Sequence, residues 1–209
     1  MNGSRMSRAW ETLQREGIRS FWFKLVDVLG YRRLFLLRRS LNEPLSRVDC
    51  RLPIRMEWLL PEGVGEYRTM RPATDPKELL SRLESRQRCL LGRWNGRLVG
   101  AMWVVGRSAR IEYLEYELPL PSATVYLCEA YTDPQFRGQG IAPALSNELL
   151  RRCREEGTQM AIRATLPENH AALRAHAKNG FVVCSLMRRI KVGSWRRHWI
   201  KDVTSQSLA

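Results

Sequence analysis

The sequence predicts an α/β fold, in which one domain of alternating strands and helices carries additional segments at both ends. Three observations indicate it. Residues 124–156 run from a β-branched and aromatic segment through a glycine-rich turn into a helical pattern. Asn95-Gly96 joins two apolar segments, which is the strongest short signal for a hairpin. The chain has 209 residues, enough for one domain with an appendage.

Residues 1–51 are predicted to form a basic amphipathic N-terminal arm. Ser7–Leu29 has the periodicity of a helix with Trp10, Phe21 and Trp22 on its apolar stripe. Tyr31–Arg39 is an apolar run between arginine pairs, and it is interpreted as an extra strand or a continuation of the helix. Three roles for the arm stay open: packing on the domain, dimerisation to a homodimer, and binding to an anionic membrane surface.

Residues 52–193 are predicted to form the main domain. Its first elements are a strand over Glu66–Pro72, a helix that begins at Asp75-Pro76, and two hairpin strands, Cys89–Trp94 and Arg97–Val105. The segment Ile111–Pro121 alternates in part and carries three glutamates. These carboxylates either form the charged face of a solvated hairpin or attract a cationic amine.

The turn at residues 137–142 has the features of a phosphate site. Gly138 and Gly140 allow successive N–H groups to point into one concavity at the positive end of the following helix. That helix is marked by four apolar side chains at intervals of four residues, and Gly157 ends it: Ile141, Leu145, Leu149 and Cys153.

The C-terminal part adds a strand, a helix, a strand and a tail. The strand is Met160–Thr165, the helix starts at Asn169, and a final strand covers Phe181–Val192. Residues 194–209 form a tail in which tryptophans alternate with basic residues. Such a tail either docks on the domain, stacks on nucleobases or enters a headgroup layer.

The charge lies mainly at the two ends of the chain. Of the net charge of +14, residues 1–51 contribute +6 and residues 182–209 contribute +5. Basic ends of this kind suit nucleic acid, anionic lipid or an acidic protein. The five cysteines are widely spaced, which predicts reduced thiols and neither a zinc site nor a disulfide framework. Without a long apolar span or a signal sequence, we expect a cytoplasmic protein that can lie at the inner face of the membrane.

Two motifs resemble those of one large family. Arg-x-x-Gly-x-Ala at 137–142, after a strand that ends in Tyr-Thr-Asp-Pro, resembles the pyrophosphate-binding loop of the GNAT superfamily, the acyl-CoA-dependent N-acyltransferases. Residues 169–181 resemble the Asn-x-x-Ala-Leu helix that ends in Gly-Phe in that superfamily. The resemblance covers about residues 52–193. It implies a bent, mixed and mostly antiparallel sheet flanked by helices, acetyl-CoA or another acyl-CoA as co-substrate, and no metal.

The resemblance also implies a set of cofactor-binding residues, which lie on the loop, on the end of the preceding strand and at the start of the later helix. A helix cap explains the asparagine equally well. The set is Ala130, Thr132, Arg137, Gly138, Gln139, Gly140, Ile141, Ala142 and Asn169.

Glu129 and His176 are the catalytic candidates. Glu129 occupies a position where many family members carry a carboxylate, and it either accepts the proton of the amine, binds its charge or forms a salt bridge. His176 stands where the family usually has a tyrosine. It either protonates the leaving sulfur as an imidazolium, or it is a polar helix residue while solvent supplies the proton. Tyr126 and Tyr131 are secondary candidates.

The function predicted on this basis is transfer of an acetyl or other acyl group from acyl-CoA to a primary amine, by direct attack in a ternary complex. The acceptor is a small-molecule or a lipid-linked amine, and nucleic acid is the less favoured partner. The alternative is a non-catalytic module of the same fold that binds CoA, anionic lipid or nucleic acid.

Overall fold

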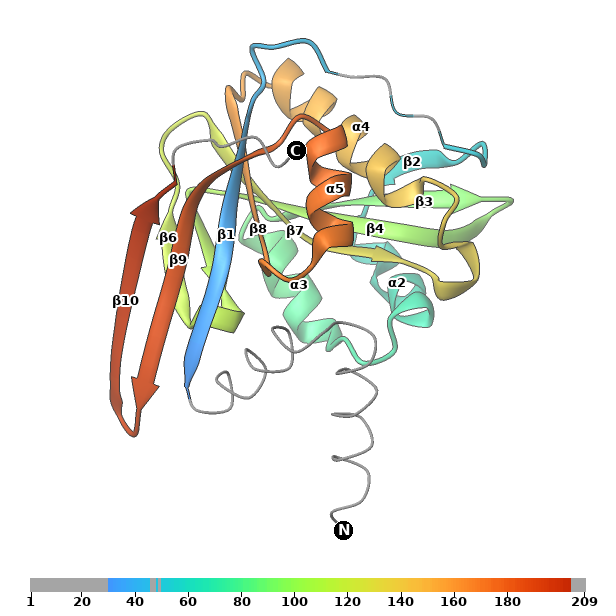
Figure 1. The fold of residues 1–209 in the computed structure, drawn as a ribbon. Helices are drawn as coiled ribbons and strands as arrows, with labels where there is room; N and C mark the ends of the chain where they lie inside the picture. The colour runs from blue at the N-terminus through green and yellow to red at the C-terminus, as the bar shows by residue number, and fades with distance from the viewer. Residues whose placement is uncertain (1–29, 46–47, 49, 204–209) are drawn as a thin grey trace, which may run out of the picture.

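The structure is a computed structural model that describes residues 30–45, 48 and 50–203 (Figure 1). In this part of the chain, a mixed eight-stranded sheet has the order β10-β9-β1-β8-β7-β4-β3-β2, and β5 and β6 form a separate hairpin. The strands are β1 (Tyr31–Ser40), β2 (Arg55–Trp58), β3 (Arg88–Trp94), β4 (Arg97–Gly106), β5 (Ser108–Ile111), β6 (Tyr116–Pro119), β7 (Thr124–Thr132), β8 (Met160–Thr165), β9 (Val182–Val192) and β10 (Trp195–Asp202). The helices are α2 (Val64–Met70), α3 (Pro76–Glu84), α4 (Ile141–Glu155) and α5 (His170–Lys178).

Helices cover both faces of the sheet (Figure 1). On one face, α4 and α5 pack over the central strands, and Ile141, Leu145 and Leu149 of α4 are fully buried there, which confirms the predicted helix face. On the other face, α2 and α3 cover β3 and β4. The β5–β6 hairpin covers β1 and neighbouring strands on that second face. The predicted bent, mostly antiparallel mixed sheet flanked by helices is therefore confirmed.

Several local signals produce the structures they predict. The Asn95-Gly96 turn joins β3 and β4 in an antiparallel hairpin. Helix α3 starts after Asp75, whose side chain accepts a hydrogen bond from the N–H of Lys77 at 2.9 Å. Each of these signals acts within a few residues, so distant contacts do not override it.

The predicted strand over Glu66–Pro72 is wrong, because residues Val64–Met70 form helix α2. Val64 and Tyr67, which lie three residues apart, are both buried, and this is the spacing of a helix face. The strand in this region is β2, which pairs with β3 at the edge of the sheet.

The predicted boundary of the N-terminal arm at residue 51 is also wrong, because β1 lies inside the sheet between β9 and β8. Leu34 and Leu36 pack toward the β5–β6 hairpin, whereas Leu37 packs toward α4. A strand that is buried on both faces reads as one apolar run, which explains why the sequence pattern was ambiguous. The predicted helix over residues 7–29 lies outside the described residues.

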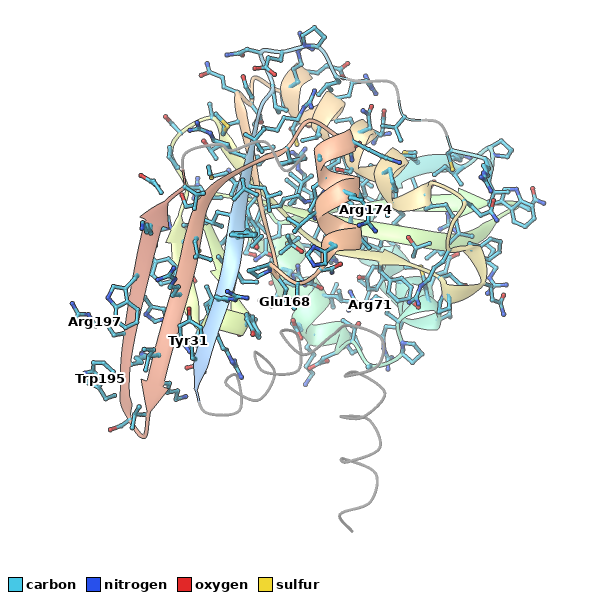
Figure 2. All side chains as sticks on the ribbon, viewed as in Figure 1. Tyr31, Arg71, Glu168, Arg174, Trp195 and Arg197 are labelled. Atoms are coloured by element: carbon cyan, nitrogen blue, oxygen red, sulfur yellow. The ribbon has the colours of Figure 1, made fainter. Side chains whose placement is uncertain are left out.

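The C-terminal tail is a strand over most of its described length. Trp195–Asp202 form β10, which pairs with β9 at the end of the sheet, so the predicted domain boundary at residue 193 falls inside a β-hairpin. The side chains of Trp195 and Arg197 project from this edge strand (Figure 2). In the part of the chain that the structure describes, no helix is long and apolar enough to cross a membrane.

Glu115 fastens the β5–β6 hairpin to the edge of the sheet. Its carboxylate forms ion pairs with Arg189 at 2.5 Å, Lys191 at 3.3 Å and Arg196 at 3.7 Å. The hydrogen bond from Arg189 is the main reason why the pKa of Glu115 lies below its usual value. Glu115 therefore forms structural ion pairs. It does not fit the amine-binding role that was considered for the glutamates of this segment.

We expect Gly180→Ala to destabilise the protein by about 2 kcal/mol or more. Gly180 has a φ of +72°, and an added Cβ would lie 1.5 Å from Nη1 of Arg39. Arg39 is buried and donates to the carbonyl oxygens of Asn179 and Pro44, so it has little freedom to move away. Chemical denaturation measures the effect.

Gly157→Ala is the matched control for this substitution. Gly157 has a φ of +88° but no atom within 4 Å of the added Cβ. Alanine at position 157 therefore introduces only the backbone strain of a positive φ, which costs about 1 kcal/mol. Equal losses in the two variants would show that Arg39 adjusts freely, contrary to this prediction.

Candidate active site

Strands β7 and β8 diverge in the middle of the sheet and leave a wedge between them. They pair in parallel only from Thr124 to Tyr126 of β7 and from Met160 to Ile162 of β8. Beyond these pairs, β7 continues beside β4 and β8 continues beside β1 (Figure 1). The edges of β7 and β8 that face the wedge therefore have backbone groups that can pair with an extended ligand.

A backbone irregularity in β7 lies beside the wedge. Glu129 has a φ of +45°, which is rare for a residue with a side chain. The register between β4 and β7 shifts at this point, between Ala101 and Trp103. An irregularity of this kind turns a side chain out of its normal alternation and is frequent beside active sites.

The glycine-rich turn and the end of β7 enclose a cavity of about 520 Å³, here called the loop cavity. Gly138 and Gly140 have φ values of +80° and +82°, as the glycine pattern predicts. The first backbone bond within α4 runs from the N–H of Ala144 to Gly140, so the earlier N–H groups of the helix point out of its start. The cavity is lined by Ala130, Tyr131, Thr132, Phe136, Arg137, Gly138, Gly140, Ile141, Ala142 and Pro143.

Seven of the nine predicted cofactor-binding residues line the loop cavity, and Gln139 and Asn169 do not. The carbonyl oxygen of Gln139 accepts a hydrogen bond from the N–H of Arg51 at 2.9 Å. Asn169 caps α5, with its side-chain oxygen accepting from the N–H of Ala172 at 3.0 Å. Gln139 thus ties the loop to the segment before β2, and Asn169 has the helix-cap role that the sequence left open.

A second cavity, of about 630 Å³, adjoins the loop cavity at Gly140 and Pro143. Arg174 and Lys178 of α5 line it, and Arg174 is visible on that helix in Figure 2. Neither residue was among the predicted cofactor-binding residues, although their spacing of four in a helix places them on one face. They extend the positive potential of the helix start toward α5.

A third and larger cavity, of about 790 Å³, lies on the opposite side of the irregularity and is here called the hairpin cavity. Residues of α3, the β5–β6 hairpin, β7 and β8 line it. Its lining includes Asn169 and four glutamates from separate elements: Glu78, Glu112, Glu117 and Glu129. Two of these glutamates pair with arginines that line the same cavity, Glu129 with Arg82 and Glu112 with Arg110.

Glu129 is held by two arginines from the helical layer. Its carboxylate lies 2.6 Å from Nη1 of Arg82 and 3.2 Å from Nη1 of Arg71, and its side chain is 41% exposed. Arg82 also lies over the ring of Trp103, with its Cζ 3.8 Å from the ring centroid. The salt bridge was one of the three roles that the sequence left open. Arg71 lies in the segment Glu66–Pro72, which was wrongly predicted as a strand. Arg82 lies on the predicted helix α3, but sequence analysis assigned it no functional role.

His176 is a neutral imidazole in this structure rather than a protonated one. Its Nδ1 lies 3.0 Å from Nη1 of Arg163, and its ring packs edge-on against Phe181. Burial, together with the positive charge of Arg163, lowers the pKa of His176 to about 3. The predicted role as an imidazolium acid therefore does not fit, because the ring carries only one N–H proton at neutral pH.

The depressed pKa of His176 predicts a specific loss of stability in acid. The unfolded chain binds the proton near the ordinary pKa of 6.5, whereas the folded chain resists it until about 3. This contribution to stability is therefore present above pH 6.5 and is lost progressively as the pH falls toward 3.

His176→Phe should reduce the loss of unfolding free energy between pH 7 and pH 4, measured by urea denaturation at several pH values. His170→Phe, on an exposed residue of the same helix, is the control. If the two variants and the unmodified protein lose stability in parallel, His176 is not the group that resists protonation.

The comparisons with known proteins identify the family and the fold. The family model of the acetyltransferase (GNAT) family matches residues 55–181, which is more than half of the chain. The protein therefore belongs to the GNAT acetyltransferase family, whose members use acetyl-CoA as co-substrate. No curated protein sequence matches the chain. Among the described residues, no three His, Cys, Asp or Glu side chains are grouped so that they could hold a metal ion.

Solved structures share the fold at low sequence identity. A GCN5-related N-acetyltransferase from Sphaerobacter thermophilus is 16% identical with a TM-score of 0.57; the match covers 88% of this chain and 56% of that one. A GNAT-family acetyltransferase from Novosphingobium aromaticivorans is 18% identical with a TM-score of 0.54, covering 84% and 69%. An N-acetyltransferase from Staphylococcus aureus is 14% identical with a TM-score of 0.51, covering 72% and 97%. The chain thus spans little more than half of the Sphaerobacter protein.

Proposed function

We propose that this protein transfers an acyl group, acetyl in the simplest case, from acyl-CoA to a primary amine by direct attack in a ternary complex. The observation that supports it most is the placement of two consecutive residues at the irregularity of β7. Glu129 lines the hairpin cavity and Ala130 lines the loop cavity. A donor in one cavity and an acceptor in the other would therefore meet at this point of the wedge, which direct transfer requires.

The loop cavity fits the diphosphate of acyl-CoA. Two glycines with positive φ allow the backbone to approach a phosphate closely, the first N–H groups of α4 point out of the helix start, and Arg137 adds a positive charge. The adjoining cavity with Arg174 and Lys178 offers further cations to an anionic ligand. The free edge of β7 at Ala130 and Thr132 would pair with the pantetheine arm. When bound, the co-substrate supplies the activated acyl thioester.

The hairpin cavity fits a small amine acceptor. Its volume is in the range of ordinary small-molecule sites. In the described part of the chain, the carboxylates of Glu78 and Glu117 have no ion-pair partner, so they are available to a cationic substrate. A primary amine arrives as an ammonium group and must lose one proton before its nitrogen can attack. Glu129 is proposed to accept that proton, directly or through an ordered water.

The proposed reaction balances without a further reactant. The amine nitrogen bonds to the acyl carbon, the carbon–sulfur bond breaks, and the sulfur keeps the electron pair as a thiolate. The ammonium group loses one proton through Glu129 to solvent before attack. The nitrogen loses a second proton to solvent as the carbon–sulfur bond breaks, which leaves a neutral amide. We assign His176 to the leaving sulfur as a hydrogen-bond donor, because a neutral ring offers a hydrogen bond and not an acidic proton.

A thiol-release assay with acetyl-CoA tests the proposal against a panel of polyamines, amino sugars and peptides. We expect release that depends on the amine, with the acetylated amine identified by mass spectrometry. Initial rates at varied concentrations of both substrates should give intersecting lines, as in a ternary complex. A protein that binds acetyl-CoA but releases no thiol with any amine would instead fit a non-catalytic module.

A further inference from the structure

Arg163 is a buried cation whose role neither the sequence motifs nor the proposed reaction explains. Its side chain is 5% exposed. Among the described residues, no carboxylate lies within ion-pair distance of it. Its guanidinium approaches Ser146 Oγ at 3.5 Å, His176 Nδ1 at 3.0 Å and Met102 Sδ at 3.8 Å. Its Cζ also lies over the ring of Phe181, 5.1 Å from the centroid. A buried cation without a carboxylate to neutralise it is costly to the fold, which favours a functional reason for its presence.

The surrounding titratable groups do not neutralise Arg163. Tyr126 and Cys128 on β7 are the ionisable groups that act on it, and burial raises the pKa of both, that of Cys128 to about 12. Both groups are therefore uncharged at neutral pH. Burial also lowers the pKa of Arg163, but only to about 10. The guanidinium thus remains charged and adds positive potential to its surroundings.

Arg163 lies at the base of the wedge. It is the first residue of β8 after the last pair with β7, and it faces Leu37 of β1 in the register. Its side chain reaches α4 at Ser146, α5 at His176 and β4 at Met102. It therefore lies under the place where β7 and β8 separate, on the side of the sheet that α4 and α5 cover.

The contact with Arg163 determines which nitrogen of His176 carries the proton. A guanidinium has only donors, so Nδ1, at 3.0 Å from Nη1, must be the acceptor. The single proton of the neutral ring then resides on Nε2. A histidine without such a partner would divide its proton between the two nitrogens.

We infer that Arg163 is a positioning residue that holds His176 as a neutral Nε2–H donor, and that this pair stabilises an anionic sulfur at the wedge. The inference rests on the proposed function. The sulfur leaves as a thiolate when the carbon–sulfur bond breaks, Nε2–H donates a hydrogen bond to it, and the guanidinium adds its charge from behind the ring. No proton leaves His176, and solvent protonates the thiolate after its release.

Nitrogen NMR of the His176 ring in the free protein tests whether Arg163 holds this ring in the Nε2–H form. We expect the Nε2–H form in the unmodified protein and a mixture of both forms in Arg163→Met. Arg163→Lys should restore the Nε2–H form, because an ammonium group also has only donors. Arg39→Met is the matched control: Arg39 is equally buried but donates to backbone carbonyl oxygens. An Nδ1–H ring in the unmodified protein, or a ring unaffected by Arg163→Met, overturns the inference.

Titration of bound CoA tests whether the Arg163–His176 pair stabilises a thiolate, and it needs no amine acceptor. The probe is CoA itself, followed through the ultraviolet absorbance of its thiolate. We expect the fraction of thiolate at a given pH to be about tenfold higher when CoA is bound, which is about one pKa unit. Arg163→Met should remove this gain, Arg163→Lys should recover part of it, and Arg39→Met should keep it. A gain that survives in a folded Arg163→Met protein overturns the inference.

Kinetics then separate this inference from the proposed function. With an amine substrate, Arg163→Met should lower kcat by about ten- to a hundredfold and leave KM for acetyl-CoA unchanged. A kcat that is unchanged in that variant overturns the positioning role even if acetylation occurs. If no amine is acetylated, the proposed function fails, while NMR and CoA titration still decide whether the pair stabilises a thiolate.

Discussion

Gly140→Asp should lower the affinity for acetyl-CoA by more than about a hundredfold while the protein stays folded. Gly140 is the N-cap of α4, has a φ of +82° and lines the loop cavity. A carboxylate at this position would cap the helix with its own oxygen and thus occupy the N–H groups that a diphosphate needs. It would also repel the diphosphate, and two like charges about 4 Å apart at the protein surface interact by roughly 1 to 4 kcal/mol.

Gly140→Asn is the matched control, because asparagine has nearly the same shape and tolerates a positive φ without adding a charge. Isothermal calorimetry with acetyl-CoA should show at most about a tenfold loss for this variant, which corresponds to 1.4 kcal/mol. Equal losses for the two variants would assign the effect to what they share, the bulk of the side chain and its capping of the helix, and not to the charge. Unchanged affinity in Gly140→Asp would show that the diphosphate does not bind at this loop.

Glu129→Gln should lower kcat for amine acetylation by about a hundredfold, which is within the usual contribution of one acid or base. The amide keeps the shape of the side chain but cannot accept the proton of the amine. KM for acetyl-CoA should not change, because Glu129 lines the hairpin cavity and not the loop cavity. Steady-state kinetics with both substrates varied measure the two constants separately.

Glu117→Gln is the control for this prediction, since Glu117 lines the same cavity from β6. If Glu117 only attracts the substrate, its replacement should raise KM for the amine and leave kcat nearly unchanged. Glu129→Gln also removes one partner each from Arg71 and Arg82, so thermal unfolding should accompany the kinetics. A kcat close to that of the unmodified protein would leave Glu129 with its salt-bridge role alone.

Local signals in the sequence were sufficient for much of the fold and for the loop cavity. The Asn95-Gly96 turn, the cap at Asp75 and the glycines at 138 and 140 each require a particular backbone conformation. The four-residue periodicity of α4 identifies its buried face. These features depend on residues a few positions apart, so the chain specifies them before any long-range contact forms.

The sequence was not sufficient where an apolar segment suits more than one environment. Tyr31–Arg39 was compatible with a strand or a helix, and only its pairing with β8 and β9 makes it a central strand of the sheet. Glu66–Pro72 was interpreted as a strand, but the packing of Val64 and Tyr67 against the sheet selects a helix. Short segments have weak intrinsic preferences, and burial against distant residues then decides their structure.

In the candidate site, too, the sequence predicts some features and long-range contacts decide the others. The sequence by itself indicated that Glu129 follows the family pattern, that His176 replaces the usual tyrosine, and that the loop before α4 suits a phosphate. The tertiary structure decided the neighbours of both side chains: Arg71 and Arg82 reach Glu129, and Arg163 reaches His176. The protonation of His176 depends on burial and on a charge 13 positions away in the sequence. Such effects depend on distance in space, which only the folded chain establishes.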